Sequence, residues 1–427
     1  MSNNCKMQSL LKKLELLVIN SRKSNIPELE RGYETLITNS NCYLIHTELL
    51  NETLDMFFQT YKQIEETLSK QEVIGRLKNL VINSLINNNP LIKELVEDFH
   101  QCLKNDFPLQ QWEIFRPLYG AKLLSNPSFE LGNCKIFEYS EFKKLVEKGY
   151  DTELLSSMKL EGDSHLIIRA IASARDQKKA RELADIKFHQ FDNIVQYMLG
   201  NSPLHVAVFD YFGVNVSKTF YIADSTKQSM SYEIKGARDL VHIDDRIPIL
   251  MNDISGIQLE SLFPEPFFFT SISQGHNWIW DISKKLDPND LEKRLISSIE
   301  WIGKSIRDSD RSRAFTQLVI AIESIFTYDE RGALVTPSIA SRISESVAFV
   351  LGKNLEERIQ IVKQISDIYS KRSGIVHGGG KVISEKDLRE TLLLVKKIVG
   401  EMTTNSKFVE MKTIQNFYEW IKEQKFS

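Results

Sequence analysis

Apolar side chains recur every three or four positions along the first part of the chain. Two such sets are Leu10, Leu11, Leu14 and Leu17, and then Leu50, Leu54, Phe57, Phe58 and Tyr61. This spacing places the apolar side chains on one face of a helix. The breaker Asn87–Pro90 interrupts the pattern, and Pro90 is suited to the first position of a following helix. We therefore expect residues 1–110 to be helical.

The middle of the chain has a different pattern. Short β-prone runs predict strands at Trp112–Phe115, Lys135–Tyr139, Leu166–Ile171, His205–Phe209, Thr219–Ile222 and Met230–Ile234. Between them lies one long amphipathic helix, Asp176–Leu199, with the candidate core positions Leu183, Phe188, Phe191, Val195 and Met198. Strands around one long helix predict an α+β domain over residues 111–283, with a boundary region near Pro264 and Pro266.

From residue 284 onward the strand signals stop, and five helical segments follow. Their start signals are Asp287-Pro288 for the first, Thr336-Pro337 for the third, Asn354 with Glu357 for the fourth, and Ser384 with Asp387 for the fifth. The expected core-facing sets are Leu291, Leu295, Ile299, Ile302 and Ile306; Phe315, Leu318, Val319, Ile322, Ile325 and Phe326; Ile339, Ile343, Val347 and Val350; Ile359, Val362, Ile365 and Tyr369. Amphipathic helices joined by short loops predict a helical bundle over residues 284–427.

These patterns together predict an α+β protein that is mostly helical. It has an N-terminal helical region over residues 1–110, a mixed α/β middle domain over 111–283 with a sensing or regulatory role, and a C-terminal all-α bundle over 284–427. A length of 427 residues is consistent with two or three domains.

Composition narrows the classes of partner. The chain has 54 Lys and Arg against 57 Asp and Glu, a net charge of −3, so any RNA contact must be a local cationic pocket. Cys5, Cys42, Cys102 and Cys134 show neither zinc-finger nor redox spacing, which indicates four reduced thiols. No apolar run reaches the roughly 18 residues of a membrane span, and Met1–Leu11 lacks a signal-peptide core. We expect a cytoplasmic protein with no membrane partner.

The strongest candidate chemistry lies in the segment YSKRSGIVHGGG, at the end of the fourth predicted helix of the bundle. Arg372 is a permanent cation whose planar fork of donors matches phosphate oxygens. His377 can accept and return a proton near neutral pH. Together they suit cleavage of an RNA phosphodiester, one group moving protons and the other offsetting charge that develops at phosphorus.

The spacing of Arg372 and His377 also has a purely structural interpretation. Arg and His near a helix C-terminus oppose the helix dipole, and the following glycines end the helix. Positions five apart on a helix point about 140° apart, so the two side chains do not converge on one phosphate if the helix is unbroken. Either Ser373-Gly374 bends the backbone, or two chains contribute to one site.

The residues around this pair resemble the HEPN superfamily, specifically the Apea-like HEPN domains of bacterial defence proteins. The segment YSKRSGIVHGGG resembles that family's Tyr-x-x-Arg-Ser-x-x-x-His-Gly signature. LVIAIESIF places Glu323 in the second helix of the bundle, where such proteins often have an acidic residue, and SIASRISESVAFVL places Arg342 in the third. The region of resemblance is the bundle, about a third of the chain.

The resemblance implies a metal-independent endoribonuclease that acts by attack of the substrate's 2′-hydroxyl, without a cofactor. Arg372 and His377 would be catalytic, and Ser373, Glu323 and Tyr369 would support them, with Arg342 structural. It also implies an RNA substrate, with tRNA as one candidate, and a homodimer through the HEPN bundle. The biological role implied is antiphage defence by abortive infection, switched on by a phage-derived trigger.

Other interpretations remain open from the sequence. The bundle is alternatively a non-catalytic HEPN module that binds RNA or a partner protein, although such modules usually lack the intact Arg and His. A metal-dependent hydrolase around His242, Asp244 and Asp245 in VHIDD would need further ligands. The basic run Arg175–Arg181 and the tryptophans of GHNWIW are candidate RNA contacts, with a solvated face and a core contact as the simpler explanations.

Overall fold

The structure is a computed structural model that describes most of the chain. The described residues are 3–24, 30–38, 41–87, 93–119, 121–123, 127–149, 166–199, 215–216, 221–223, 241–242, 268–308, 310–328, 338–377 and 382–426. The expected strands His205–Phe209 and Met230–Ile234, the boundary prolines Pro264 and Pro266, and the Thr336-Pro337 start signal lie outside these ranges.

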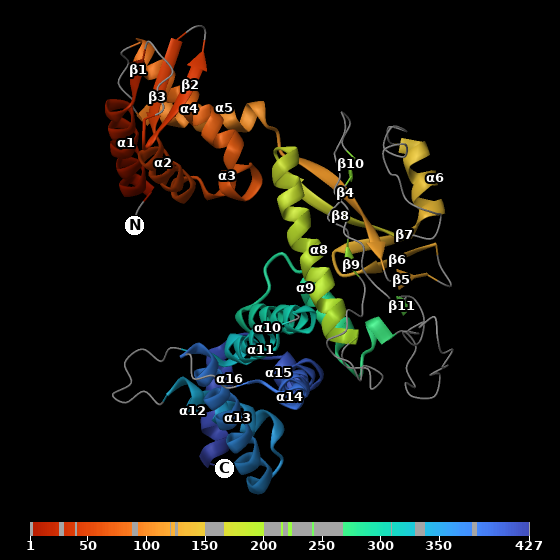
Figure 1. The fold of residues 1–427 in the computed structure, drawn as a ribbon. Coiled ribbons are helices and arrows are strands. Elements are labelled where there is room, and N and C mark those ends of the chain that lie inside the picture. The colour runs from red at the N-terminus through yellow and green to blue at the C-terminus, as the bar shows by residue number, and fades with distance from the viewer. Residues whose placement is uncertain are drawn as a thin grey trace. The chain divides into compact units, whose positions relative to one another are not determined.

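The protein is a mostly helical α+β protein, as predicted (Figure 1). Its backbone packs into two compact units: Met1–Ile114 with Ile171–Asp185, and Phe115–Ala170 with Ile186–Ser427. The division passes through three elements of the middle region: β4 (Gln110–Tyr119), β8 (Leu166–Ala174) and α8 (Gln177–Leu199). Because the units follow backbone packing and not function, the three functional regions expected from the sequence stay a prediction.

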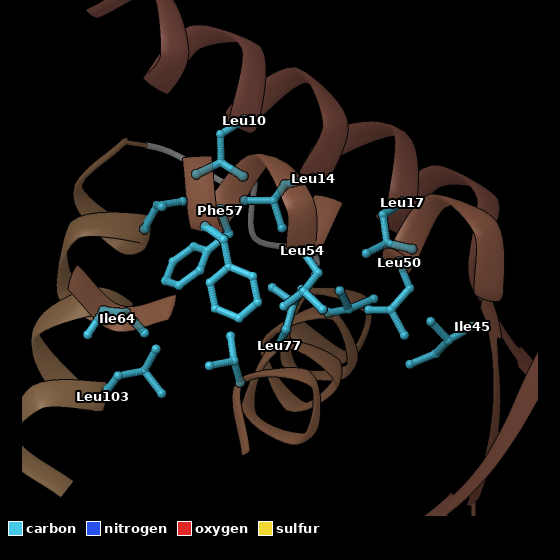
Figure 2. Close-up of a cluster of buried hydrophobic side chains, with 14 of the residues drawn as sticks. Leu10, Leu14, Leu17, Ile45, Leu50, Leu54, Phe57, Ile64, Leu77 and Leu103 are labelled. Atoms are coloured by element: carbon cyan, nitrogen blue, oxygen red, sulfur yellow. The ribbon is translucent and has the colours of Figure 1, made fainter. Parts of the chain in front are cut away.

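The first unit combines helices with a small antiparallel sheet. Its elements before residue 110 are α1 (Asn3–Asn20), β1 (Arg22–Ser24), β2 (Tyr33–Thr38), β3 (Asn41–His46), α2 (Thr47–Thr60), α3 (Lys62–Thr67), α4 (Lys70–Asn87) and α5 (Lys93–Asp106). The sheet order is β1-β3-β2. In the core, Leu10, Leu14 and Leu17 of α1 lie above Leu50 and other α2 side chains (Figure 2).

The expectation that residues 1–110 are helical was wrong at residues 22–24, 33–38 and 41–46, which form strands. The central strand, β3, reads NCYLIH, and its inner residues Cys42, Tyr43, Leu44 and Ile45 are buried. Such a short apolar run has neither helical nor alternating periodicity, so periodicity alone does not identify it. The β-branched and aromatic residues of β2, YETLIT, were the available strand signal.

The middle region holds one larger sheet beside a long helix. Its elements are β4 (Gln110–Tyr119), β5 (Ala121–Lys122), β6 (Ser128–Leu131), β7 (Cys134–Glu138), α6 (Tyr139–Gly149), β8 (Leu166–Ala174), α8 (Gln177–Leu199), β9 (Asn215–Val216), β10 (Tyr221–Ala223) and β11 (Val241–His242). The strand order is β10-β4-β8-β7-β6, with β9 beside β4 and β11 pairing with β5. The expected strands within β4, β7 and β8 and the long helix are confirmed. Of the expected strand Thr219–Ile222, the described residues 221 and 222 lie in β10.

The second half of the long helix α8 is largely buried. Phe188, Phe191, Val195 and Met198 form its core face as predicted, whereas Leu183 is only partly buried. The four cysteines are free thiols, as predicted, and burial raises the pKa of Cys134 to about 12. None of the helices in the described ranges has the length and apolar character needed to cross a lipid bilayer.

The C-terminal part is all-helical. After η1 (Phe268–Thr270) come α9 (His276–Ser283), α10 (Asp290–Arg307), α11 (Arg311–Phe326), α12 (Ile339–Leu351), α13 (Leu355–Val376), α14 (Glu385–Thr404), α15 (Ser406–Val409) and α16 (Ile414–Phe426). Helix α10 packs on α11 and α12 packs on α13, while α14 contacts α10, α11 and α12 (Figure 1). The predicted helical bundle is thus present, with α16 as a further helix that the sequence interpretation missed.

The helix starts follow local capping chemistry. Asn354 caps α13 by accepting from the Glu357 backbone, and Ser384 forms a reciprocal capping box with Asp387 at the start of α14, both as predicted. Helix α10 instead begins after Asn289, whose side chain forms a capping box with Glu292, two residues beyond the expected Asp287-Pro288 start. The Asn289 amide oxygen accepts a hydrogen bond from the Glu292 backbone N–H, which would otherwise lack a partner at the helix start. This cap, and not Pro288, sets where α10 begins.

The core faces of the bundle are only partly as predicted. All six expected positions of α11 are fully buried, and so are the first four of α10. In α12 the expected core residue Ile339 is exposed, and in α13 Ile365 is buried whereas Ile359 and Val362 are 60% and 40% exposed. One apolar edge of α13 therefore faces solvent within this chain.

Candidate functional site

Arg372 lies near the end of α13, on the side that faces the bundle interior. It follows buried Ile365 by about two helical turns and buried Ile368 by about one, so the three side chains share one side of the helix. That side meets α11, because an Arg372 Nη2 lies 3.8 Å from a Glu323 Oε2. The Arg372 side chain is more than a third exposed and the Glu323 side chain about a fifth, so the pair lies at the edge of the bundle and is partly open to solvent.

Tyr369 joins the same cluster from one turn earlier on α13. Its hydroxyl is buried, and no partner lies within ordinary hydrogen-bond geometry among the described residues. Burial is the main cause that raises the pKa of Tyr369, followed by the negative charge of the Glu323 carboxylate and a weak side-chain hydrogen bond with it. Glu323, Tyr369 and Arg372 are therefore brought together by the packing of α11 against α13.

His377 lies at the other side of the helix end. It is the C-cap residue of α13, and its backbone N–H donates to the Ser373 carbonyl at 3.0 Å. The helix is continuous through Ser373 and Gly374, so the structure shows no break at these two residues. His377 follows exposed Ile359 by 18 residues, about five full turns, and is itself exposed.

The two candidate catalytic residues occupy different sides of the helix end. In ideal helix geometry positions five apart point about 140° apart, and here Arg372 lies beside Glu323 of α11 whereas His377 is exposed. Ser373 is exposed, and its backbone carbonyl accepts a hydrogen bond from the His377 N–H. Of the five residues predicted from the sequence, Glu323, Tyr369 and Arg372 cluster together. The other two, Ser373 and His377, are exposed and lie outside this cluster.

A contact that the sequence interpretation missed holds the end of α13 in place. The Lys371 ammonium donates to the carboxylate of Asp387 at the start of α14. Together with the hydrogen bonds from Ser384, it lowers the pKa of Asp387 to about 2. The sequence shows both residues, Lys371 next to Arg372 and Asp387 as a capping residue of α14. Because they are 16 positions apart in the chain, local sequence patterns do not predict that they form a pair.

A groove on the bundle lies away from Arg372 and His377. It has a volume of about 860 Å³ between α12 and the first half of α13, and its walls include Phe349, Leu355, Ile359 and Val362. Ser366 is its lining residue closest in sequence to Arg372. Arg342 also lines it and donates to the Tyr328 carbonyl at 2.7 Å, which agrees with the structural role expected for Arg342.

The weaker candidates have structural explanations where they are described. Arg175, in the basic run, donates to the backbone carbonyls of Lys104 and Phe107 and is thus a tether within the first unit. Trp280 is buried and its indole N–H donates to the Phe269 carbonyl at 2.9 Å. His242 lies in β11, and Asp244 and Asp245 of VHIDD lie outside the described residues.

Comparison with known proteins gives no match for this chain among protein-family models, curated proteins or solved structures.

Proposed function

We propose that the C-terminal bundle is a metal-independent endoribonuclease of the HEPN type, with Arg372 and His377 as its catalytic pair. The observation that carries this proposal is the arrangement at the end of α13. An arginine backed by a carboxylate and an exposed histidine lie within one turn and a half of each other, in a helical bundle. The signature-like segment YSKRSGIVHGGG supports the same assignment.

The chemistry follows from the two side chains. His377 would take the proton of the ribose 2′-hydroxyl, or give one to the leaving 5′-oxygen. The 2′-oxygen attacks phosphorus, the bond to the 5′-oxygen breaks, and a 2′,3′-cyclic phosphate and a 5′-hydroxyl result. The Arg372 fork would bind the non-bridging phosphate oxygens, where negative charge grows in the transition state.

The divergence of the two side chains favours a site shared between two copies. Since α13 is unbroken, one chain does not bring Arg372 and His377 to the same phosphate without rearrangement. We therefore infer a homodimer through the bundle, with two Arg372–His377 pairs facing one cleft.

The biological role that we propose is antiphage defence in the cytoplasm. A nuclease that cuts the infected cell's own RNA, with tRNA as one candidate substrate, would stop translation and so abort the infection. Residues 1–283 would sense a phage-derived trigger or restrain the nuclease. This role rests on the family resemblance, because fold alone does not determine biology.

The test is to map the ends of RNA cut by the purified full chain, with and without EDTA. We expect 5′-hydroxyl and 2′,3′-cyclic phosphate ends, unchanged cutting of an unstructured RNA in EDTA, and intact DNA. His377→Ala should lower the rate by about 10²–10⁴-fold. A 5′-phosphate product, or complete loss of cutting in EDTA, would contradict the mechanism. Binding of RNA without cleavage, equal in wild type and His377→Ala, would instead identify a non-catalytic binding module.

A further inference from the structure

The polar cluster between α11 and α13 leaves its charges incompletely paired. The 3.8 Å between Arg372 Nη2 and Glu323 Oε2 is an ion-pair distance but is too long for a hydrogen bond. The Arg372 Nε is buried and has no hydrogen-bond partner among the described residues. Arg372 is therefore held near Glu323 by charge, without the directed bonds that would fix it there.

Tyr369 supplies a second donor beside the same carboxylate. Its hydroxyl is buried, and no partner lies within ordinary hydrogen-bond geometry in the described part of the chain. Burial, the Glu323 charge and a weak side-chain hydrogen bond with Glu323 raise the pKa of Tyr369, so the phenol keeps its proton beside that carboxylate. Tyr369 and Arg372 are three positions apart, which makes them neighbours on one helical face. Glu323 thus has two candidate donors, the Arg372 guanidinium and the Tyr369 hydroxyl.

We propose that Glu323 and Tyr369 are a positioning pair that controls when Arg372 is free to bind phosphate. Without substrate, the Glu323 carboxylate retains the guanidinium. When a phosphodiester arrives, the Arg372 fork turns to its oxygens, and the weak hydrogen bond from the Tyr369 hydroxyl to Glu323 shortens to a full one. The inference rests on the proposed function, since it assigns Arg372 to phosphate.

This change of partners is favourable because the partly buried Glu323 carboxylate always keeps a donor, first the Arg372 guanidinium and then the Tyr369 hydroxyl. Taking the cation away from Glu323 without a replacement donor would strand a negative charge among buried groups, which is costly. A phenol hydrogen bond to an ionised carboxylate is a strong, charge-assisted one and offsets this cost. The substrate phosphate in turn receives both Nη groups of a guanidinium whose fork matches its oxygens.

The variants separate a positioning role from a structural one. Tyr369→Phe removes only the hydroxyl, and Glu323→Gln removes the charge but keeps the shape. The matched control is Tyr418→Phe on α16, another largely buried tyrosine, whose hydroxyl donates to the Phe326 carbonyl at 2.7 Å and not to Glu323. Thermal unfolding of each full-length variant confirms that it is folded.

The experiment measures binding of a fluorescent 2′-deoxy oligonucleotide, which lacks the reacting hydroxyl, and the kcat and KM for RNA cleavage. Glu323→Gln should bind several-fold more tightly, because Arg372 is no longer retained. Tyr369→Phe should bind roughly fivefold to tenfold more weakly, a size typical of directly coupled neighbours. In the double variant Glu323→Gln/Tyr369→Phe, removal of the Tyr369 hydroxyl should no longer weaken binding. The Glu323 charge that this hydroxyl would stabilise is already gone. Tyr418→Phe should bind like wild type.

The outcomes distinguish the two proposals. If wild type cuts RNA but Tyr369→Phe binds normally, or the two substitutions act additively, the positioning pair is wrong and the nuclease stands. If the binding cycle appears as described but no RNA is cut, the pair stands and the nuclease is wrong. If wild type does not bind the oligonucleotide at all, both are overturned.

Discussion

Arg372 is a residue whose value to the proposed reaction depends on geometry as well as charge. Its guanidinium sits beside Glu323 with an unpartnered buried Nε among the described residues. A lysine at this position keeps the positive charge but replaces the planar fork with a point charge. The carboxylate would attract the lysine as it attracts the arginine.

We therefore predict that Arg372→Lys lowers kcat/KM for RNA cleavage by about 10²–10³-fold, the range for loss of one directed charge-stabilising donor. Single-turnover cleavage by the purified variant measures this. A variant within twofold of wild type would mean that charge alone suffices, and Arg372 would no longer be assigned to bidentate phosphate binding.

Gly303 lets two helices, α10 and α8, pack closely because glycine has no Cβ atom. It lies in α10, and a Cβ built on it would meet the Asn193 backbone of α8, with its carbonyl oxygen at 2.4 Å and its Cα at 2.5 Å. Backbone atoms cannot move aside as a flexible side chain can. The close packing of α10 on α8 therefore requires glycine at this position.

We predict that Gly303→Ala destabilises the protein by about 1–3 kcal/mol, the usual cost of overpacking. Chemical denaturation measures it. Gly400→Ala in α14 is the matched control, because a Cβ there meets nothing within 4 Å. It should stabilise by about 0.4–1 kcal/mol through a less flexible unfolded chain. Equal effects of the two substitutions would contradict the close contact.

At the level of elements, α13 serves two surfaces at once. Its core side holds Ile365, Ile368 and Arg372 against the bundle, while the opposite side carries exposed Ile359 and His377. Its end is attached to α14 by the Lys371–Asp387 contact. The position of the candidate site therefore depends on how α14 begins.

The start of α14 should respond to acid. The hydrogen bond from Lys371, and then that from Ser384, lower the pKa of Asp387 to about 2, below the unfolded value of about 3.9. A lowered folded-state pKa stabilises the protein at pH above about 4, and this contribution disappears as the pH falls toward 2. We predict that Asp387→Asn costs about 0.5–2 kcal/mol at pH 7, as for loss of a helix cap, and close to nothing at pH 2.

The control for that prediction is Glu385→Gln, in the same first turn of α14. Glu385 pairs with Arg311 at 3.7 Å, but both side chains are more than half exposed. Its substitution should cost less than about 1 kcal/mol. Urea unfolding at several pH values measures both variants. If Asp387→Asn and Glu385→Gln had the same effect at every pH, the charge on Asp387 would contribute nothing specific.

For the whole molecule, the prediction concerns assembly. Because positions 372 and 377 point in different directions on a continuous helix, the site that we propose would be completed by a second copy. We expect light scattering to give twice the mass of the 49.3 kDa chain at micromolar concentration. Specific activity should fall on dilution as the dimer dissociates. A strictly monomeric protein with undiminished activity at high dilution would rule out the shared site.

The local pattern of the chain was sufficient to predict most helices of the C-terminal bundle. Core faces of α10 and α11 follow from the spacing of their apolar residues, and the caps Asn354 and Ser384 follow from side chains that bond their own backbone. Both are interactions between residues a few positions apart. The same local view identified Arg372 and His377 as the candidate pair.

Packing between distant segments decided the remainder. Glu323 meets Arg372 only because α11 lies against α13, and the spacing of α13 does not say that Ile359 stays exposed while Ile365 is covered. Periodicity tells which residues share a face, but a face is buried only if another element covers it. For the same reason the sheet over residues 22–46 was missed, since strands are stabilised by neighbours that lie elsewhere in the chain.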